Sequence, residues 1–166
     1  MQTAPRPEPS FEQQIGRIAG IICSDRFATG ERAALRRMTP GQPLPLYFYR
    51  FAFSHLPQGW EHAIDDWTTI VAGIALMSPN AHAPRIGLGG ALAEAGYSDS
   101  RLERLLAADD EVRRTLFLRA VRFLAAQSKP FNWVEGARFL LTKDDDKREL
   151  LHLHLARDFY NKIDRE

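Results

Sequence analysis

A chain of 166 residues is long enough for one ordinary domain with a buried core, or for two very small subdomains. Its 45% hydrophobic and 26% charged residues lie near the globular average, which argues against wholesale disorder. The formal net charge of +1 gives no global signal for nucleic acid, but 18 of the 22 basic residues are Arg. Arg pairs bidentately with phosphate and carboxylate, so an Arg-dominated surface suits phosphate contact. A GC-rich genome that favours Arg codons explains the same bias equally well.

The single cysteine, Cys23, excludes an internal disulfide framework and a cysteine-based zinc site. It fits a reducing compartment. The longest apolar patches are well below the roughly 18–20 residues that span a bilayer, and no secretory signal opens the chain. We therefore expect a soluble protein of the cytoplasm that has no membrane partner.

The first half of the chain reads as helices joined by Pro-rich links. Residues 1–10 hold three prolines and no apolar period, which predicts a disordered tail. Residues 46–55 alternate like a strand, but we predict a helix because no partner strand appears elsewhere. The helices expected here cover residues 11–23, 25–38, 46–55 and 60–77, and the second is a short helix or helical turn with Thr29 or Gly30 at its start.

The second half begins with two short helices joined by a tight turn, in residues 85–110. Gly96 ends the first helix, and Ser98 to Ser100 offers N-caps for the second. Further helices are expected at 111–127, at 133–141, and from the acidic run 144–146 to about residue 162. These elements predict an all-α fold of eight or nine helices.

Motifs of catalysis or of cofactor and metal binding are lacking. The run Gly87-x-Gly89-Gly90 departs from the dinucleotide fingerprint and follows no strand, so close helix approach or loop flexibility explains it better. His152 and His154 are two apart on an expected helix and point to different faces, so they cannot share one metal. We expect no catalytic centre, no cofactor and no metal site.

Arginine clusters are the remaining signal. Residues 26–50 hold five Arg against one acid, Glu31, a local net charge of +4. On the helix at 111–127 we place Val112, Leu116, Ala120, Phe123 and Leu124 on the buried arc and Arg114, Arg119 and Arg122 on the opposite arc. Each cluster alone is more often a solvated face, but four clusters favour a surface that tracks phosphates without reading sequence. The clusters contain Arg26, Arg32, Arg36, Arg37 and Arg50; Arg101 and Arg104; Arg114, Arg119 and Arg122; and Lys147 and Arg148.

The order of segments resembles a known family. It begins with Ala33-Ala34-Leu35-Arg36-Arg37, a Pro-rich link, and Phe48-Tyr49-Arg50 leading to Trp60. It continues with residues 87–93, Gly96 and the helix at 100–106, then Asn132-Trp133 before Arg138, and closes with residues 147–159. From about residue 30 to 159 the chain is similar to the small, CasB-type subunit of the type I-E CRISPR Cascade complex.

This resemblance implies an all-α, non-catalytic subunit that works in antiviral defence. It also implies two small helical bundles, which we expect to cover residues 11–83 and 84–166. Its implied partners are the backbone and large subunits of Cascade, the crRNA, the target DNA and a second copy of itself, placed head to tail. Its implied role is to stabilise the R-loop and the displaced non-target strand. Arg36 and Arg37 match the family's basic pair best; the other candidates for nucleic-acid binding are Arg32, Arg101, Arg104, Arg119, Arg122, Arg138, Lys147 and Arg148. The acidic run 144–146 weakens the case for the last two.

Two other functions fit parts of the sequence. Residues 91–106 resemble a helix-turn-helix, which would make the protein a DNA-binding regulator that reads base edges from the start of its second helix. A purely structural helical adaptor would instead use its arginines in salt bridges with other proteins.

Overall fold

Helices make up the regular structure of this chain. The structure is a computed structural model and describes residues 4–165. Within that range the expected all-α class is confirmed, and the pairing of His82 with Phe131 is an isolated bridge. The described residues form nine α-helices and one 3-10 helix: α1 (Phe11–Ile22), α2 (Thr29–Arg36), α3 (Leu46–His55), η1 (Trp60–Ala63), α4 (Ile64–Met77), α5 (Leu88–Glu94), α6 (Asp99–Ala107), α7 (Asp110–Ala126), α8 (Trp133–Leu141) and α9 (Asp145–Ile163).

The chain enters its first helix through a capping box. Ser10 Oγ accepts a hydrogen bond from the Gln13 backbone N at 3.2 Å, and Ser10 N donates to Gln13 Oε1 at 3.0 Å. Residues 4–10 are exposed and have no regular secondary structure. The first three residues of the predicted tail lie outside the described residues.

The helices of the first half follow the prediction with one exception. α2 begins at Thr29, one of its two predicted starts, after a turn that Phe27 N closes by donating to Ser24 O. The helix expected over 60–77 is divided into η1 and α4, since Ala63 departs from helical geometry at φ −137°, ψ 44°. α3 is helical throughout residues 46–55, as predicted.

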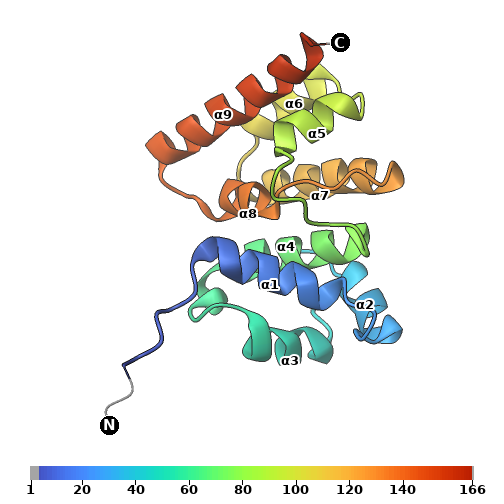
Figure 1. Cartoon of the computed structure of the whole chain (residues 1–166), viewed down its shortest axis with the longest axis vertical. Helices are drawn as coiled ribbons and strands as arrows, with labels where there is room; N and C mark the ends of the chain where they lie inside the picture. Colours follow the sequence, from blue (N-terminus) through green and yellow to red (C-terminus); the bar gives the residue numbers. More distant parts are fainter. Residues whose placement is uncertain (1–3, 166) are drawn as a thin grey trace.

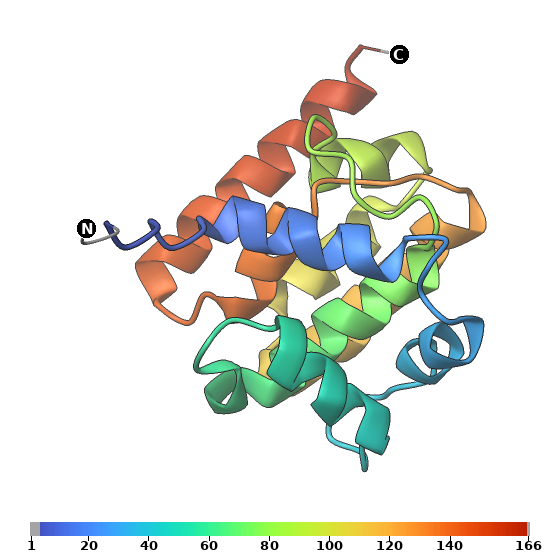
Figure 2. The ribbon, with the colours of Figure 1, turned by 60° about the horizontal axis from the view of Figure 1, so that its bottom comes forward.

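Helix α4 lies at the centre of the molecule. It packs against α1, α2, α7 and α8, and Figure 1 shows α5, α6 and α9 beyond α7. Figure 2 shows α1 running across α4, with α3 on the side away from α9. One cluster of buried side chains includes residues from both predicted halves. The division into bundles 11–83 and 84–166 stays a prediction.

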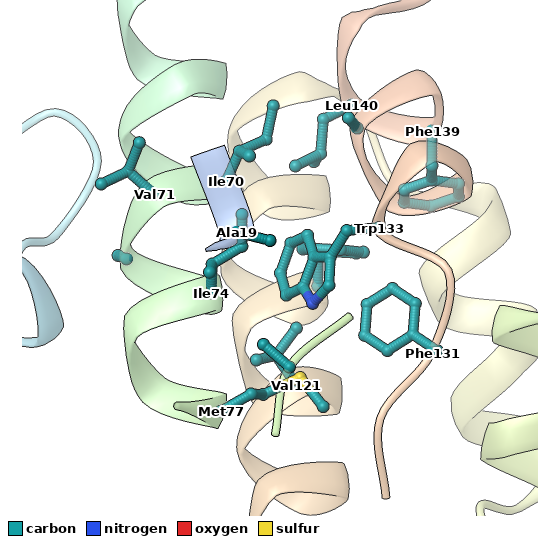
Figure 3. Close-up of a cluster of buried hydrophobic side chains, with 14 of the residues drawn as sticks. Ala19, Ile70, Val71, Ile74, Met77, Val121, Phe131, Trp133, Phe139 and Leu140 are labelled. Carbon is teal, nitrogen blue, oxygen red and sulfur yellow. The ribbon is translucent and has the colours of Figure 1, made fainter. Parts of the chain in front are cut away.

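Trp133 is fully buried where α1, α4, α7 and α8 meet (Figure 3). Its ring lies among Ala19, Ile74 and Val121, which come from three different helices. A Cβ atom on Gly73 of α4 would lie 2.4 Å from the indole ring. Glycine at this position therefore makes the space that the tryptophan fills.

Helices α5 and α9 approach each other at Gly89. A Cβ atom there would lie 2.2 Å from the backbone oxygen of Leu155 and 2.9 Å from the backbone nitrogen of Phe159. Backbone atoms cannot rotate out of the way, so only glycine allows this approach. For Gly89, the expectation that the glycine run serves close helix contact is confirmed.

The N-terminus of α5 is capped by distant side chains. Gly87, at the N-cap position, has no side chain to offer the free backbone N–H groups. Glu135 Oε2 of α8 accepts from Leu88 N at 2.7 Å, and Asp158 Oδ2 of α9 accepts from Gly90 N at 2.8 Å. The two carboxylates thereby join three helices of the second half.

Replacing Gly89 with Ala should destabilise the protein by about 1–3 kcal/mol, because the added Cβ overlaps the backbone of α9. Chemical denaturation would measure the free energy of unfolding. Gly20→Ala is the matched control: nothing lies within 4 Å of a Cβ at that exposed position of α1. The control should gain about 0.5–1 kcal/mol from the lower entropy of its unfolded chain. Equal stability of the two variants would contradict this account of α5 and α9.

The links before α5 and α8 meet at His82. Ala83 N donates to Phe131 O at 3.0 Å, and Trp133 N donates to His82 Nδ1 at 3.1 Å. The accepting Nδ1 atom carries no proton. Burial lowers the pKa of His82 below its ordinary value, and burial also lowers the pKa values of His55 and His152.

We expect the protein to lose stability as the pH falls from about 7 toward 5. Below about pH 6.5 the unfolded chain binds protons that the folded chain resists, because the folded-state pKa of His82 is depressed. His82→Asn keeps an acceptor for Trp133 N but does not titrate, so this variant should lose less stability over that range. Denaturation at several pH values would measure it, with the exposed His62→Asn as control. A pH dependence in His82→Asn equal to that of the wild type would refute the role of this histidine.

Candidate nucleic-acid interface

Two pairs of arginines meet where α6 packs against α7. Ser98 caps α6, its Oγ accepting from Arg101 N at 3.3 Å, and Asp109 caps α7, its carboxylate accepting from Val112 N at 3.4 Å. Only residues 108 and 109 separate the two helices, so α6 folds directly back onto α7. Each helix contributes two Arg three positions apart, which lie on one helix face. The four residues are Arg101 and Arg104 on α6, and Arg119 and Arg122 on α7.

These side chains surround one cavity, which we call the arginine-lined depression. Its volume is about 500 Å³, and its lining has three apolar or aromatic members, Tyr97, Leu116 and Phe123. The Tyr97 and Phe123 ring centroids lie 5.6 Å apart. The Arg101 guanidinium lies 5.9 Å and 5.7 Å from these two centroids, within the range of cation–π attraction. The full lining is Tyr97, Arg101, Arg104, Leu116, Arg119, Arg122 and Phe123.

The positive charge of this depression is uncompensated. All four arginines are exposed, and no acidic side chain contributes to the lining. Across residues 4–165, none of the four forms an ion pair with a carboxylate. Burial raises the pKa of Tyr97, so its hydroxyl stays uncharged near neutral pH. The depression can therefore hold an anion that also carries an apolar or aromatic group.

Arg36 and Arg37 lie elsewhere, at the end of α2. Both are exposed. Arg36 Nε donates to Ala75 O at 3.3 Å near the C-terminal end of α4, and Arg37 lines a separate depression of about 420 Å³ with Met38 and Gln42. This pair remains available to a phosphate and forms a second candidate site.

Two other predicted residues are engaged within the chain. Arg32 donates to Ile22 O at 2.9 Å and to Ser24 O at 2.7 Å, at the C-terminal end of α1, where backbone carbonyls lack helical partners. Arg138 of α8 forms an ion pair with Glu12 of α1. Arg32 and Arg138 thus connect elements of the fold, and their role in nucleic-acid binding stays a prediction.

The last basic pair is divided between two environments. Arg148 bonds to Asp110 of α7 and donates to Thr142 O at 2.7 Å, so its partner is not the neighbouring acidic run. Lys147 is exposed and forms no ion pair in the described part of the chain. Of the two, Lys147 alone retains a charge free for an external anion.

The buried face of α7 differs from the predicted arc by about one residue position. Val112 is 49% exposed, whereas Arg113 is 1% exposed. The Arg113 guanidinium lies 3.5 Å from the Phe139 ring centroid and donates to Phe139 O at 2.9 Å and 3.1 Å. Burial lowers the pKa of Arg113 to about 10, so it stays charged at neutral pH. Sequence reasoning missed this residue, although its helical spacing with Phe117 and Leu124 was a signal.

The prediction that Arg114 lies on the outer arc with Arg119 and Arg122 is wrong. Its guanidinium lies 3.2 Å from the carboxylate of Asp66, which is 4% exposed. Lys143 Nζ lies 2.9 Å from the other oxygen of Asp66 and 3.3 Å from Asp110. A buried acid needs such partners, because removing a charge from water is costly. These ion pairs hold α4, α7 and the link before α9 together.

The histidines that sequence analysis considered as metal ligands lie apart. His154 Nε2 is 3.1 Å from Glu135 Oε1, whereas the His152 ring packs against the Phe139 ring. In the range 4–165 no three His, Cys, Asp or Glu side chains lie together as metal ligands would. Among the described residues, no helix is both long and apolar enough to cross a bilayer.

Comparisons with known proteins give a consistent result. A model of the CRISPR-associated protein Cse2 family matches residues 31–160 of this chain. The crystal structure of M. ruber CasB is similar in fold, with a TM-score of 0.64 and 22% sequence identity over 95% of this chain and 97% of the other. The comparison with curated proteins found no match. Because the family match spans well over half of its length, the chain belongs to the family of the CRISPR-associated protein Cse2, the CasB-type small subunits.

Proposed function

We propose that this protein is the non-catalytic small subunit of a type I-E CRISPR Cascade complex and stabilises the R-loop in the cytoplasm. In this role it binds the sugar-phosphate backbone of the displaced non-target strand. The observation that supports the proposal most strongly is the arginine-lined depression, where four uncompensated guanidiniums from two helices lie together. The clustered guanidiniums repel one another, and an anionic partner would relieve this repulsion on a chain that is otherwise nearly neutral.

The energetics of R-loop formation suit weak, sequence-independent contacts. The RNA–DNA hybrid that forms is about as stable as the DNA duplex that it replaces, so small contributions decide whether the R-loop persists. Arginine contacts to phosphate supply such contributions for any target sequence. Arg36 and Arg37, at the end of α2, provide a second point at which the strand is held.

Assembly with other subunits is part of the same proposal. The partners would be the backbone and large subunits, the crRNA with its target DNA, and a second copy of the chain. Large exposed apolar side chains mark surfaces that such protein partners cover. Leu46 and Phe53 of α3 are 84% and 73% exposed, and Leu150 and Leu153 of α9 are 67% and 53% exposed.

The helix-turn-helix alternative is less compatible with the geometry of α6. A recognition helix contacts base edges with its first residues. Here the first helical residue is an acid, Asp99, which accepts a hydrogen bond from the Tyr160 hydroxyl of α9 at 3.3 Å. An acid at this point repels the phosphates that flank a groove, so α6 is poorly suited to enter one.

Replacing both Arg119 and Arg122 with Ala should weaken binding to single-stranded DNA roughly tenfold at moderate salt, because two phosphate contacts are lost. The slope of log K against log salt concentration should fall by about 1.4, which is about 0.7 per contact for a single strand. Titration of the purified full chain with fluorescent DNA across a salt series would measure both quantities.

A double variant of Lys129 and Lys162 to Ala is the matched control. It also removes two positive charges, but both are paired within the chain, with Glu94. This control should bind DNA within about twofold of wild type, since exposed paired charges offer little to a phosphate. Equal losses in the two double variants would mean that net charge alone drives binding. If the protein assembles with its partner subunits but has no affinity for DNA, the alternative of a purely structural helical adaptor is supported instead.

Changing Arg36 and Arg37 to Ala should leave the helical fold intact and shorten the lifetime of the R-loop in the reconstituted complex. The physical reason is the loss of phosphate contacts on α2, while the one internal bond lost, from Arg36 to Ala75 O, is long at 3.3 Å. Single-molecule or filter-retention measurements would give the lifetime, and circular dichroism would check the fold. A wild-type lifetime would rule out this pair as a DNA contact.

A further inference from the structure

The lining of the arginine-lined depression differs from that of a surface that only follows phosphates. Tyr97, 8% exposed, and the partly buried Leu116 and Phe123 give the cavity an apolar and aromatic part. A surface that only follows phosphates needs cations alone. An aromatic surface within a ring of arginines offers two kinds of contact to one ligand.

The size and chemistry of the cavity suit one kind of group. Its volume of about 500 Å³ lies within the range of about 300–1,000 Å³ typical of ligand pockets. A planar nucleobase stacks on aromatic side chains, and Arg guanidiniums stack on or attract the same π systems. Arg101 already lies within 6 Å of the Tyr97 and Phe123 ring centroids, so it can adjust over an inserted base.

The rim supplies the contacts that the rest of a nucleotide needs. Arg104, Arg119 and Arg122 line the same cavity, and guanidiniums bind phosphate oxygens bidentately. No acidic side chain is part of the lining to repel those oxygens. An aromatic base that carries phosphate groups is thus the ligand chemistry that matches both parts of the site.

We infer that the arginine-lined depression binds an unstacked base of single-stranded nucleic acid on Tyr97, Leu116 and Phe123, while its arginines hold the flanking phosphates. The inference rests on the proposed function and extends it, because it assigns a site to a base as well as to the backbone. A paired base cannot leave its stack without cost, so such a site favours a displaced single strand over a duplex. Binding stays tolerant of sequence, since every base has a π face.

The first experiment compares two strands of equal charge. Full-length protein is titrated with an oligothymidine strand and with the same strand carrying several abasic positions, at one salt concentration. The strand with bases should bind on the order of tenfold more tightly, as expected for stacking of a base. Phe123→Ala should abolish this difference, while the exposed Phe53→Ala, on α3, should preserve it.

A second measurement covers the case in which Phe123→Ala disturbs folding, since Phe123 packs against the core. Phe123→Leu keeps an apolar side chain and loses only the ring, and it should also reduce the preference for bases. In the wild-type protein, a strand that contains 5-iodouracil should form photo-cross-links that mass spectrometry assigns to Tyr97 or Phe123.

The outcomes separate this inference from the proposed function. Equal binding of the two strands, or cross-links confined to other parts of the chain, would overturn the base site and leave backbone binding intact. Absence of binding to either strand would overturn both. Thymidine monophosphate serves as the free-nucleotide probe. Tight binding of this monophosphate to the depression, with no competition from the strand, would show that a free nucleotide is the ligand and would overturn the assignment to a strand.

Discussion

The burial of Trp133 against Gly73 is the constraint on which the arrangement of the helices depends. The indole occupies the space where a side chain on α4 would stand, and α1, α7 and α8 close around it (Figure 3). An aromatic side chain of this size removes more apolar surface from water than any other residue, so its position fixes the elements around it. Helix α7 packs against α4 and also contacts α5, α6 and α8, and the rest of its surface faces solvent.

Helix α7 uses the same residue type for two opposite purposes. Arg113 is buried and donates hydrogen bonds to Phe139 O, and the mostly buried Arg114 forms an ion pair with Asp66. Arg119 and Arg122 emerge on the exposed side without such partners. Because successive residues of an α-helix are rotated by about 100° around its axis, the two pairs of arginines lie on different faces of α7. The internal ion pairs fix the rotation of α7 about its axis, and this rotation determines where the outer arginines lie.

Local signals in the sequence predicted the helices, because capping and helical period act over a few residues. Ser98, one of the predicted N-cap candidates, caps α6 in the structure. Chemistry that depends on distant partners was not predictable in this way. Neither the bond from Arg32 to Ile22 O nor the pairing of Arg138 with Glu12 follows from any pattern within one helix. The displaced arc of α7 has the same origin, because the partner of Arg113 is 26 residues away in α8.

The distribution of charge explains how a chain with a net charge of +1 can present a locally cationic surface. Acids such as Asp66, Asp110 and Glu12 neutralise arginines and lysines that hold helices together. This leaves cationic side chains concentrated at α6, α7 and the end of α2, where no acid of the described chain compensates them. A low net charge limits long-range attraction to any nucleic acid, whereas the local field at the depression acts within about a Debye length, roughly 8–10 Å. Under the proposed function, such a surface would meet the DNA strand by being placed beside it in the complex, and its contribution to a nearly balanced R-loop would be modest.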